Sequence, residues 1–379
     1  MSAKAILPPA MLGILGGGQL GRMFAAAAKT MGYRVTVLDP DPLAPAADFA
    51  DVHLAAPFND AQALETLAKT CAAVTTEFEN VNADAMRDLA RRGVRVSPSG
   101  DCVAVAQDRI VEKGWVKKAG LATVPYLAIE TVDDLHTELE PYLPGILKTA
   151  RLGYDGKGQV RVDTPEAARA AYANLGGQAC VLEKRVELKT EVSVVVTRVT
   201  HAQMSTFPVA ENRHVNGILD VSIVPAGIPA ALAEQAQQMA RQLADALDYV
   251  GVLAVEFFVL EDDTLLVNEI APRPHNSGHY TLDACVTSQF QQQVRAMCGL
   301  LPGSTTLLKP AVMVNLLGDV WLEGGGEPNW AVLMEAPNVE LHLYGKKEAR
   351  PGRKMGHFTV LADSAEAALT QAEALKDTL

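Results

Sequence analysis

The chain has 379 residues, of which 49% are hydrophobic and 21% are charged, and its formal net charge at pH 7 is −12. This length predicts two or three globular domains, and the negative charge argues against non-specific binding to nucleic acid or to an anionic membrane surface. The five cysteines form no Cys-x-x-Cys pair, and the chain has neither a signal-peptide core nor a membrane-spanning apolar run, so we expect a cytoplasmic protein with reduced thiols and no zinc site.

Residues 11–100 alternate strand signals with helix signals, a rhythm that predicts a parallel sheet covered by helices. The first turn, GILGGGQLGRM, contains the G-x-G-x-x-G pattern of a dinucleotide-binding fold, and the next strand ends in Asp39, where such a fold holds a ribose. Two interpretations follow: the loop binds NAD, or it keeps this geometry for another ligand. The stretch SPSGDCVAVAQDRIVEKGWVKKAGL then indicates a turn, a capping Ser or Asp, and a helix that leaves the domain.

A second glycine-rich stretch, KTARLGYDGKGQ (148–159), lies among short β-branched strands between about 120 and 210. It lacks the G-K-[ST] ending and the following helix of a P-loop. We interpret it as a hairpin whose backbone N–H groups can cover a triphosphate, with Lys148 within reach. The alternative is a flexible hairpin with a solvated lysine, and this stretch alone does not decide between them.

Two strands are expected in VGVLAVEFFVLEDDTLLVNEIA, after an amphipathic helix over roughly 230–247. If Asp262 and Asp263 form a two-residue turn, Glu256 lies directly opposite Glu269. Two opposed carboxylates in an apolar setting need a cation, and oxygen ligands suit Mg²⁺. Asn268 would alternate to the other face unless a bulge intervenes. The alternative is an exposed strand face with incidental acids.

The last part of the chain is expected to form a helix near 283–299 and a small α+β tail over 310–379. The tail contains YGKKEARPGRKMGH, a basic stretch that is unusual in a chain of charge −12. Charge-assisted hydrogen bonds to phosphate are strong, so this stretch suits a phosphate group.

The order of motifs, from the first glycine loop through QDR, LKTARLGYDGKGQ, EKRVELKTEVSV and ENRHVNGIL to VNEIAPRPHNSGHYT, resembles that of ATP-grasp enzymes. Within that superfamily the chain closely resembles the N5-carboxyaminoimidazole ribonucleotide synthetases over essentially its whole length. The resemblance implies an α/β and α+β protein with a Rossmann-like acceptor domain (1–105), an ATP-grasp domain (106–305, lid at about 120–185) and a C-terminal α+β domain (306–379). It also implies a ligase, usually a homodimer, that carboxylates 5-aminoimidazole ribonucleotide with ATP, Mg²⁺ and bicarbonate through carboxyphosphate, in purine biosynthesis.

The resemblance also assigns site residues. The implied ATP contacts are Arg109, Lys148, Gly153, Tyr154, Asp155, Gly156, Lys157, Gly158, Gln159, Glu183, Lys184, Arg185, Val186, Glu191, His214, Asn268 and Glu269. The implied Mg²⁺ ligands are Glu256 and Glu269. The implied acceptor contacts are Gln19, Leu20, Glu77, Asn276, Lys346, Arg353 and Lys354, and the residues implied around the reaction centre are Tyr154, Asp155, Arg273 and His275.

Under this resemblance the first glycine loop serves the acceptor and Asp39 is a turn residue. Two alternatives remain within the superfamily. One is formate-dependent glycinamide ribonucleotide transformylase, and the other is biotin carboxylase, which is disfavoured because this chain is short for a biotin carboxylase. An NAD-dependent dehydrogenase would leave the carboxylate pair and the second glycine loop unexplained. A non-catalytic binding protein on the same scaffold would be expected to have lost a metal carboxylate, and both are present.

Overall fold

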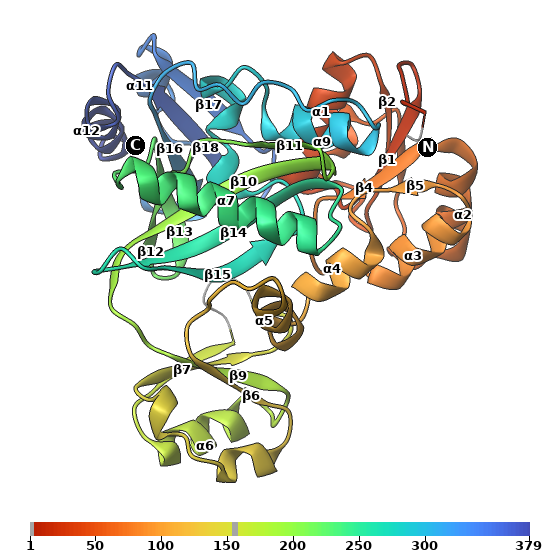
Figure 1. The fold of residues 1–379 in the computed structure, drawn as a ribbon. Helices are drawn as coiled ribbons and strands as arrows, with labels where there is room; N and C mark the ends of the chain where they lie inside the picture. The colour runs from red at the N-terminus through yellow and green to blue at the C-terminus, as the bar shows by residue number, and fades with distance from the viewer. Residues whose placement is uncertain (1–3, 154–157) are drawn as a thin grey trace.

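The computed structural model describes residues 4–153 and 158–379, and its N-terminal part is a parallel five-stranded sheet of order β3-β2-β1-β4-β5 (Figure 1). This confirms the predicted βαβ arrangement. The strands are β1 (Met11–Leu15), β2 (Arg34–Leu38), β3 (Val52–Leu54), β4 (Ala73–Thr76) and β5 (Arg95–Val96), and the helices are η1 (Ala47–Phe49), α1 (Gln19–Thr30), α2 (Ala61–Thr70) and α3 (Ala83–Arg91).

A small antiparallel sheet of order β6-β9-β7-β8 forms the lid, which Figure 1 shows set apart from the rest of the molecule. Its apolar face packs against α6 and the short helices around Leu135 and Leu139. The elements are β6 (Tyr126–Ile129), η2 (Val132–His136), η3 (Glu140–Tyr142), β7 (Gly145–Thr149), β8 (Gln159–Val162), α6 (Pro165–Asn174) and β9 (Cys180–Lys184).

A nine-stranded sheet forms the body, and it runs in the order β15-β14-β10-β12-β13-β16-β18-β17 with β11 paired to β10. The C-terminal strands β16 to β18 therefore extend the sheet that carries the carboxylate hairpin. The strands are β10 (Leu188–Thr200), β11 (Gln203–Thr206), β12 (Ala210–Val215), β13 (Ile218–Val224), β14 (Gly251–Leu260), β15 (Leu265–Ala271), β16 (Ala311–Leu317), β17 (Val339–Leu343) and β18 (Lys354–Leu361). The helices are α7 (Ala230–Ala246), η4 (Asn276–Gly278), α8 (Thr281–Ala284), α9 (Gln289–Met297), α10 (Gly318–Glu323), α11 (Ala331–Met334) and α12 (Ala365–Lys376).

The single helix expected after the first domain is in fact two, α4 (Gly100–Ala106) and α5 (Arg109–Lys118). Each has its own N-cap: the Ser99 hydroxyl accepts from Cys102 N, and the Asp108 carboxylate accepts from Ile110 N at 3.0 Å. A second capping residue inside the stretch starts a new helix, because it satisfies N–H groups that a continuous helix would pair internally. Arg109 thus begins a helix that lies between the lid and the body (Figure 1).

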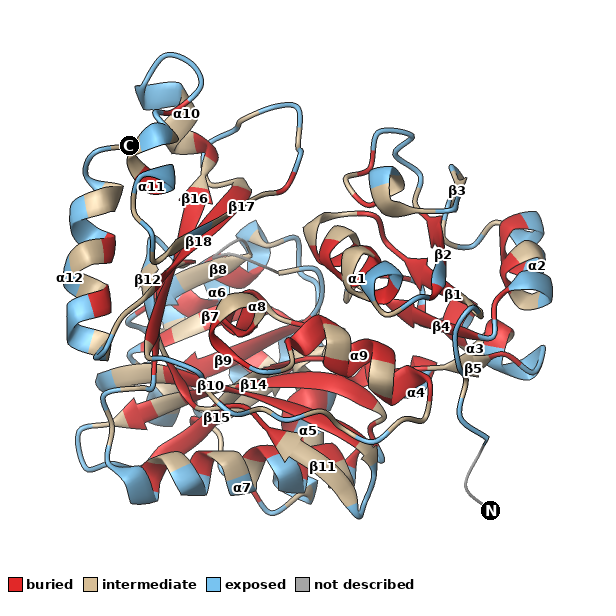
Figure 2. Ribbon diagram, turned by 90° about the horizontal axis from the view of Figure 1, so that it is seen from above, coloured by how far each residue is buried: buried red, intermediate tan, exposed pale blue. Residues whose placement is uncertain are grey.

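Helix α9 joins the N-terminal domain to the body (Figure 2). Phe290 and Val294 on α9 share one buried cluster with Phe24 on α1. The Gln293 side chain accepts from Val252 N in the body at 2.7 Å and donates to Thr75 Oγ1 in the N-terminal sheet at 2.9 Å. These buried contacts hold the glycine loop in a fixed position relative to the body.

All five cysteines are buried and unbridged, as expected for reduced thiols. Within residues 4–153 and 158–379, no helix combines the length and the apolar character that a membrane span requires.

Candidate active site

The first glycine loop is already occupied by carboxylates of the chain itself. Glu77 Oε2 accepts from Gly21 N at 2.6 Å, and its Oε1 accepts from Gly18 N. Asp39 Oδ2 accepts from Gly17 N at 2.6 Å. These N–H groups lie at the N-terminus of α1, where a dinucleotide-binding fold holds pyrophosphate. The loop therefore cannot hold the NAD pyrophosphate while Glu77 and Asp39 remain there.

The other residues predicted around this loop lie as follows. Asp39 also accepts from Asp41 N at 2.8 Å, in the turn that was expected of it. Gln19 is half-buried at the start of α1, whereas Leu20 packs in the core against α9. A Cβ at Gly16, where φ is +101°, would lie 2.5 Å from the Glu77 side chain, so only glycine admits that carboxylate.

The carboxylate pair is present, but its hairpin differs from the prediction. Leu260 N donates to Thr264 O, so the turn has three residues rather than two. Asn268 is then an extra residue in β15, and this bulge restores the register that places Glu256 opposite Glu269. Strict alternation fails at a bulge, so the reason for placing Asn268 on the other face no longer holds.

The two carboxylates have different electrostatic surroundings. Burial, with the charges of Glu269 and Glu191, raises the pKa of Glu256 well above its usual value. Burial acts in the same direction on Glu269, but Arg109, whose Nη1 lies 3.1 Å away, and Lys148 hold the Glu269 pKa below its usual value. Glu256 is the more enclosed of the two, with 14% of its side chain exposed against 40% for Glu269. An excess of negative charge in such a site favours a bound cation.

Lys148 contacts the hinge of the lid. Its Nζ lies 2.5 Å from Glu183 Oε2, and Lys113 Nζ lies 2.8 Å from Glu183 Oε1. Burial alone would raise the Glu183 pKa, but the two ammonium groups hold it at about 2. The Glu183 carboxylate is thus paired with two lysines. The rest of the hinge, the segment 183–186 that joins the lid to the body, has Lys184 and Arg185 exposed and Val186 half-buried.

The second glycine stretch joins β7 to β8, and Lys148 pairs with Gln159 across them, as a hairpin requires. Gly153 O accepts from Arg109 Nη2 at 3.4 Å. Gly158 has φ +71°, and a Cβ there would lie 2.6 Å from Thr149 Oγ1, so this position requires glycine. The predicted site residues Tyr154, Asp155, Gly156 and Lys157 lie outside the described residues.

Glu191 and His214 come together at the sheet face next to the hairpin. Glu191 Oε2 lies 3.5 Å from His214 Nδ1, and both side chains are half-buried. Burial raises the pKa of Glu191, and the Glu269 charge adds to this against the opposing effect of His214. Glu191, Glu256 and Glu269 are therefore one group of interacting carboxylates.

The predicted reaction-centre residues connect this group to the N-terminal domain. His275 Nε2 lies 3.5 Å from Glu256 Oε1, and burial together with the Arg273 charge lowers the His275 pKa well below its usual value. Arg273 Nε donates to Glu79 Oε2 at 2.9 Å. A neutral imidazole thus lies beside Glu256, the carboxylate that was predicted to bind Mg²⁺, and a guanidinium held by the first domain acts on the same carboxylate.

The remaining predicted acceptor contacts lie in η4, directly after His275, and in the basic stretch that leads into β18. Asn276 exchanges two amide hydrogen bonds with Asn315, at 2.9 and 2.7 Å. Lys346 Nζ donates to Lys354 O at 2.6 Å, and Arg353 Nη1 donates to Glu348 O at 2.7 Å. The basic stretch lies beside α1, since a Cβ on Gly345 would be 3.1 Å from the Arg22 guanidinium.

Four buried or half-buried residues of the site have no counterpart in the sequence prediction: Glu79, Glu112, Lys113 and Asn315. Glu112 Oε1 accepts from Ile270 N at 2.5 Å, and burial together with the Glu269 charge raises the Glu112 pKa to about 8. For Glu112 and Lys113 the sequence contains little indication of burial, because charged residues on a helix usually lie on its solvated face.

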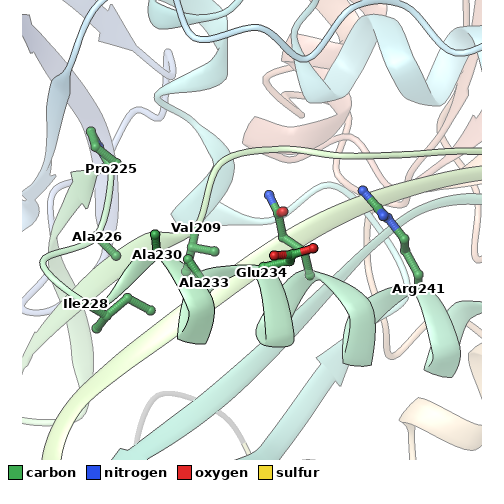
Figure 3. A pocket seen from close by; sticks show the side chains of 9 residues that line it. Val209, Pro225, Ala226, Ile228, Ala230, Ala233, Glu234 and Arg241 are labelled. Atoms are coloured by element: carbon green, nitrogen blue, oxygen red, sulfur yellow. The ribbon is translucent and has the colours of Figure 1, made fainter. Parts of the chain in front are cut away.

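A cavity of about 610 Å³ lies along α7 (Figure 3). Val209, Ile228 and Ala233 line its apolar part, and Glu234 and Arg241 lie at its edge. Of the described residues that were predicted to contact ATP or the acceptor, none lines this cavity.

Three family models match the chain in order. A ribonucleotide synthetase preATP-grasp domain matches residues 10–107, an ATP-grasp domain matches residues 115–290, and a phosphoribosylaminoimidazole carboxylase C-terminal domain matches residues 311–371. Two similar curated proteins are the N5-carboxyaminoimidazole ribonucleotide synthases of Bacillus subtilis, 46% identical over 95% of this chain and 94% of that one, and of Brucella melitensis, 45% identical over 95% and 98%.

Solved structures agree with this. An ADP complex of an N5-carboxyaminoimidazole ribonucleotide synthetase superposes with a TM-score of 0.92 at 44% identity, covering 99% of this chain and 98% of that one. The Aspergillus clavatus synthase in complex with ADP and 5-aminoimidazole ribonucleotide gives 0.88 at 32% identity, covering 100% and 99%. Together with the carboxylate-filled glycine loop, these matches argue against the dehydrogenase alternative, and the chain belongs to the N5-carboxyaminoimidazole ribonucleotide synthase family of ATP-grasp ligases.

Proposed function

We propose that this chain carries out the reaction of its family, the ATP- and bicarbonate-dependent carboxylation of the exocyclic amine of 5-aminoimidazole ribonucleotide. The single observation that supports this most strongly is the position of Glu256. It lies opposite Glu269, which is one of the predicted nucleotide contacts. It also lies 3.5 Å from His275, which directly precedes the predicted acceptor contact Asn276. Groups suited to phosphate transfer and groups suited to the acceptor therefore meet at one carboxylate.

ATP would lie between the lid and the body, with Lys148 and Arg109 near its phosphates and the hinge backbone near its adenine. Glu256 and Glu269 fit Mg²⁺, because they are oxygen donors in a group where burial and then mutual repulsion raise the Glu256 pKa. When bound, Mg²⁺ would neutralise charge on the transferring phosphoryl group. Glu191 and His214 are suitably placed near these carboxylates for contacts to the nucleotide ribose.

The acceptor would lie between the first glycine loop and the basic stretch before β18, with its phosphate on Lys346, Arg353 and Lys354. Glu77 is held by two backbone N–H groups, which leaves lone pairs on both oxygens for ribose hydroxyls. Arg273 would bind the anionic bicarbonate or carboxyphosphate, and this would compete with its contact to Glu79. The placement of Tyr154 and Asp155 over the reaction centre rests on the resemblance, and Asp155 is our candidate for the base that takes the amine proton.

The reaction is tested by measuring phosphate release from Mg-ATP and bicarbonate with and without 5-aminoimidazole ribonucleotide. We expect turnover to require the acceptor and bicarbonate, and the carboxylated ribonucleotide to appear in equal amount. Acceptor-independent hydrolysis without that product would contradict the proposal. An NADH titration of the same preparation should show no binding.

We also propose a cytosolic homodimer and domain boundaries near residues 105 and 305. The dimer and the boundaries follow from the family resemblance, and the cytosolic location follows from the sequence composition. The boundary near 305 falls between the segments matched by the second and third family models, and the one near 105 lies next to the end of the first matched segment at residue 107. Sedimentation equilibrium tests the dimer, and limited proteolysis with mass spectrometry tests the boundaries.

A further inference from the structure

Three buried charged side chains from different elements form what we name the lysine–glutamate triad: Lys113 on α5, Lys148 on β7 and Glu183 on β9. Each ammonium takes one carboxylate oxygen, at 2.8 Å from Lys113 and 2.5 Å from Lys148. The exposed fractions are 1% for Lys113, 7% for Lys148 and 3% for Glu183. Charges so enclosed interact strongly because little water screens them.

The triad carries two positive charges and one negative charge, so its net charge is +1. If Lys113 were absent, the sum would be zero. Lys148, 2.5 Å from Glu183, would then be the one lysine paired with that carboxylate, with Arg109 acting on it only through the longer-range interaction of their charges. An ammonium compensated in this way has less charge to offer a phosphate group. The second lysine thus determines how much of the Lys148 charge remains available.

We propose that Lys113 is a positioning residue, which neutralises Glu183 so that the charge of Lys148 stays available to the phosphates of a nucleoside triphosphate. This inference rests on the proposed contact between Lys148 and ATP. Lys113 acts through Glu183 rather than on the nucleotide, because its side chain is almost fully enclosed. Its ammonium group is paired with Glu183, lies 5.5 Å from the Tyr126 ring and interacts electrostatically with the neighbouring Glu112.

The position of Lys113 on α5 supports this role. Arg109, four residues earlier on the same helix, contacts Glu269 at 3.1 Å. One turn of α5 therefore carries counter-ions for two carboxylates, one on the hinge of the lid and one in the proposed metal site. Residues four apart share one helix face, so both reach the space between lid and body.

The test is calorimetric titration of the full-length protein with Mg-ADP, with thermal unfolding measured for every variant. Lys113→Met should weaken ADP binding by about ten-fold or more, because a charge-assisted contact is compromised. The double variant Lys113→Met/Glu183→Gln restores the net charge of +1 and should bind within about three-fold of the parent. Lys113→Arg should keep most of the affinity. Lys117→Met removes an exposed lysine one turn later on the same helix and is the matched control.

Two outcomes would overturn the inference: a folded Lys113→Met variant with parental ADP affinity, or a double variant that binds more weakly than the single variant. If Lys113→Met does not fold, the ADP affinities of two other variants still test the inference. Glu183→Gln should bind ADP at least about as well as the parent, and the double variant should bind it within about three-fold of the parent. Lys148→Met separates the two levels of the argument. If it leaves ADP binding unchanged, the proposed role of Lys148 is wrong. If it weakens binding and Lys113→Met does not, only the inference about Lys113 is wrong.

Discussion

Glu256 and Glu269 face each other across β14 and β15, but they have different counter-ions. Glu269 lies 3.1 Å from the Arg109 guanidinium, which is permanently charged, whereas Glu256 lies 3.5 Å from the His275 imidazole, whose pKa is lowered. Without a bound cation, Glu269 is paired with a contacting guanidinium, whereas the charges of Lys354 and Arg273 oppose the rise of the Glu256 pKa without preventing it. The two carboxylates should therefore respond differently to neutralisation.

Glu256→Gln and Glu269→Gln should both reduce turnover at least about a hundred-fold, because each removes a proposed metal ligand. Their effects on stability without metal should have opposite signs. Glu256→Gln removes a buried charge that burial and the neighbouring carboxylates destabilise, and it should stabilise the fold. Glu269→Gln leaves Arg109 without its partner and should destabilise the fold by about 1–3 kcal/mol. Activity assays and calorimetric unfolding in EDTA measure both. Equal stability changes would contradict this assignment of counter-ions.

Glu77→Gln should lower the free energy of unfolding by about 1–3 kcal/mol and raise the acceptor KM. In glutamine an NH2 group replaces one of the two carboxylate oxygens, so a donor would face either Gly18 N or Gly21 N, each of which now has its own accepting oxygen. Asp39→Asn is the matched control on the same loop, and it should lower stability with little change in the acceptor KM. If the two variants changed the acceptor KM equally, Glu77 would act through the loop alone.

The carboxylate hairpin shows how far the sequence could predict the site. The count from a two-residue turn placed Glu256 opposite Glu269 correctly, but only because the extra turn residue is offset by the extra residue Asn268. Neither was visible in the sequence, since the left-handed turn position is filled by Asp263, with φ +64°, and the bulge contains no glycine. The chemistry of the pair, two acids in an apolar setting, was readable because it depends on residue type.

The contributions of α5 could not be predicted in this way. Periodicity would bury the apolar residues of RIVEKGWVKKAG, yet Val111 is 43% exposed while Glu112 and Lys113 are buried. These two residues are enclosed because Ile270 N and Glu183 lie opposite them in the fold. Partners so distant along the chain leave no local signal, so tertiary contacts override the pattern.

Glu183 gives a prediction for acid stability. Its pKa is about 2 in the fold against an ordinary value of 4.5, so its stabilising contribution is complete above pH 4.5 and is lost as pH falls towards 2. Between these pH limits the free energy of unfolding of the parent should fall by roughly 3 kcal/mol more than that of the Glu183→Gln variant. Urea unfolding at several pH values measures how steeply the free energy of unfolding changes with pH. The control Glu166→Gln, at a side chain that is 81% exposed, should keep the parental slope.

The two basic sites should separate in steady-state kinetics. Arg353→Ala should raise the acceptor KM about ten- to a hundred-fold and leave the KM for ATP nearly unchanged, because it removes a proposed charge-assisted contact to the acceptor phosphate. Lys148→Ala should mainly reduce kcat, since its charge acts at the transferring phosphoryl group. Lys347→Ala removes an exposed charge from the same basic stretch and should change neither constant by more than about two-fold. If Arg353→Ala instead raised the KM for ATP and left the acceptor KM unchanged, the ligands assigned to the two glycine loops would have to be exchanged.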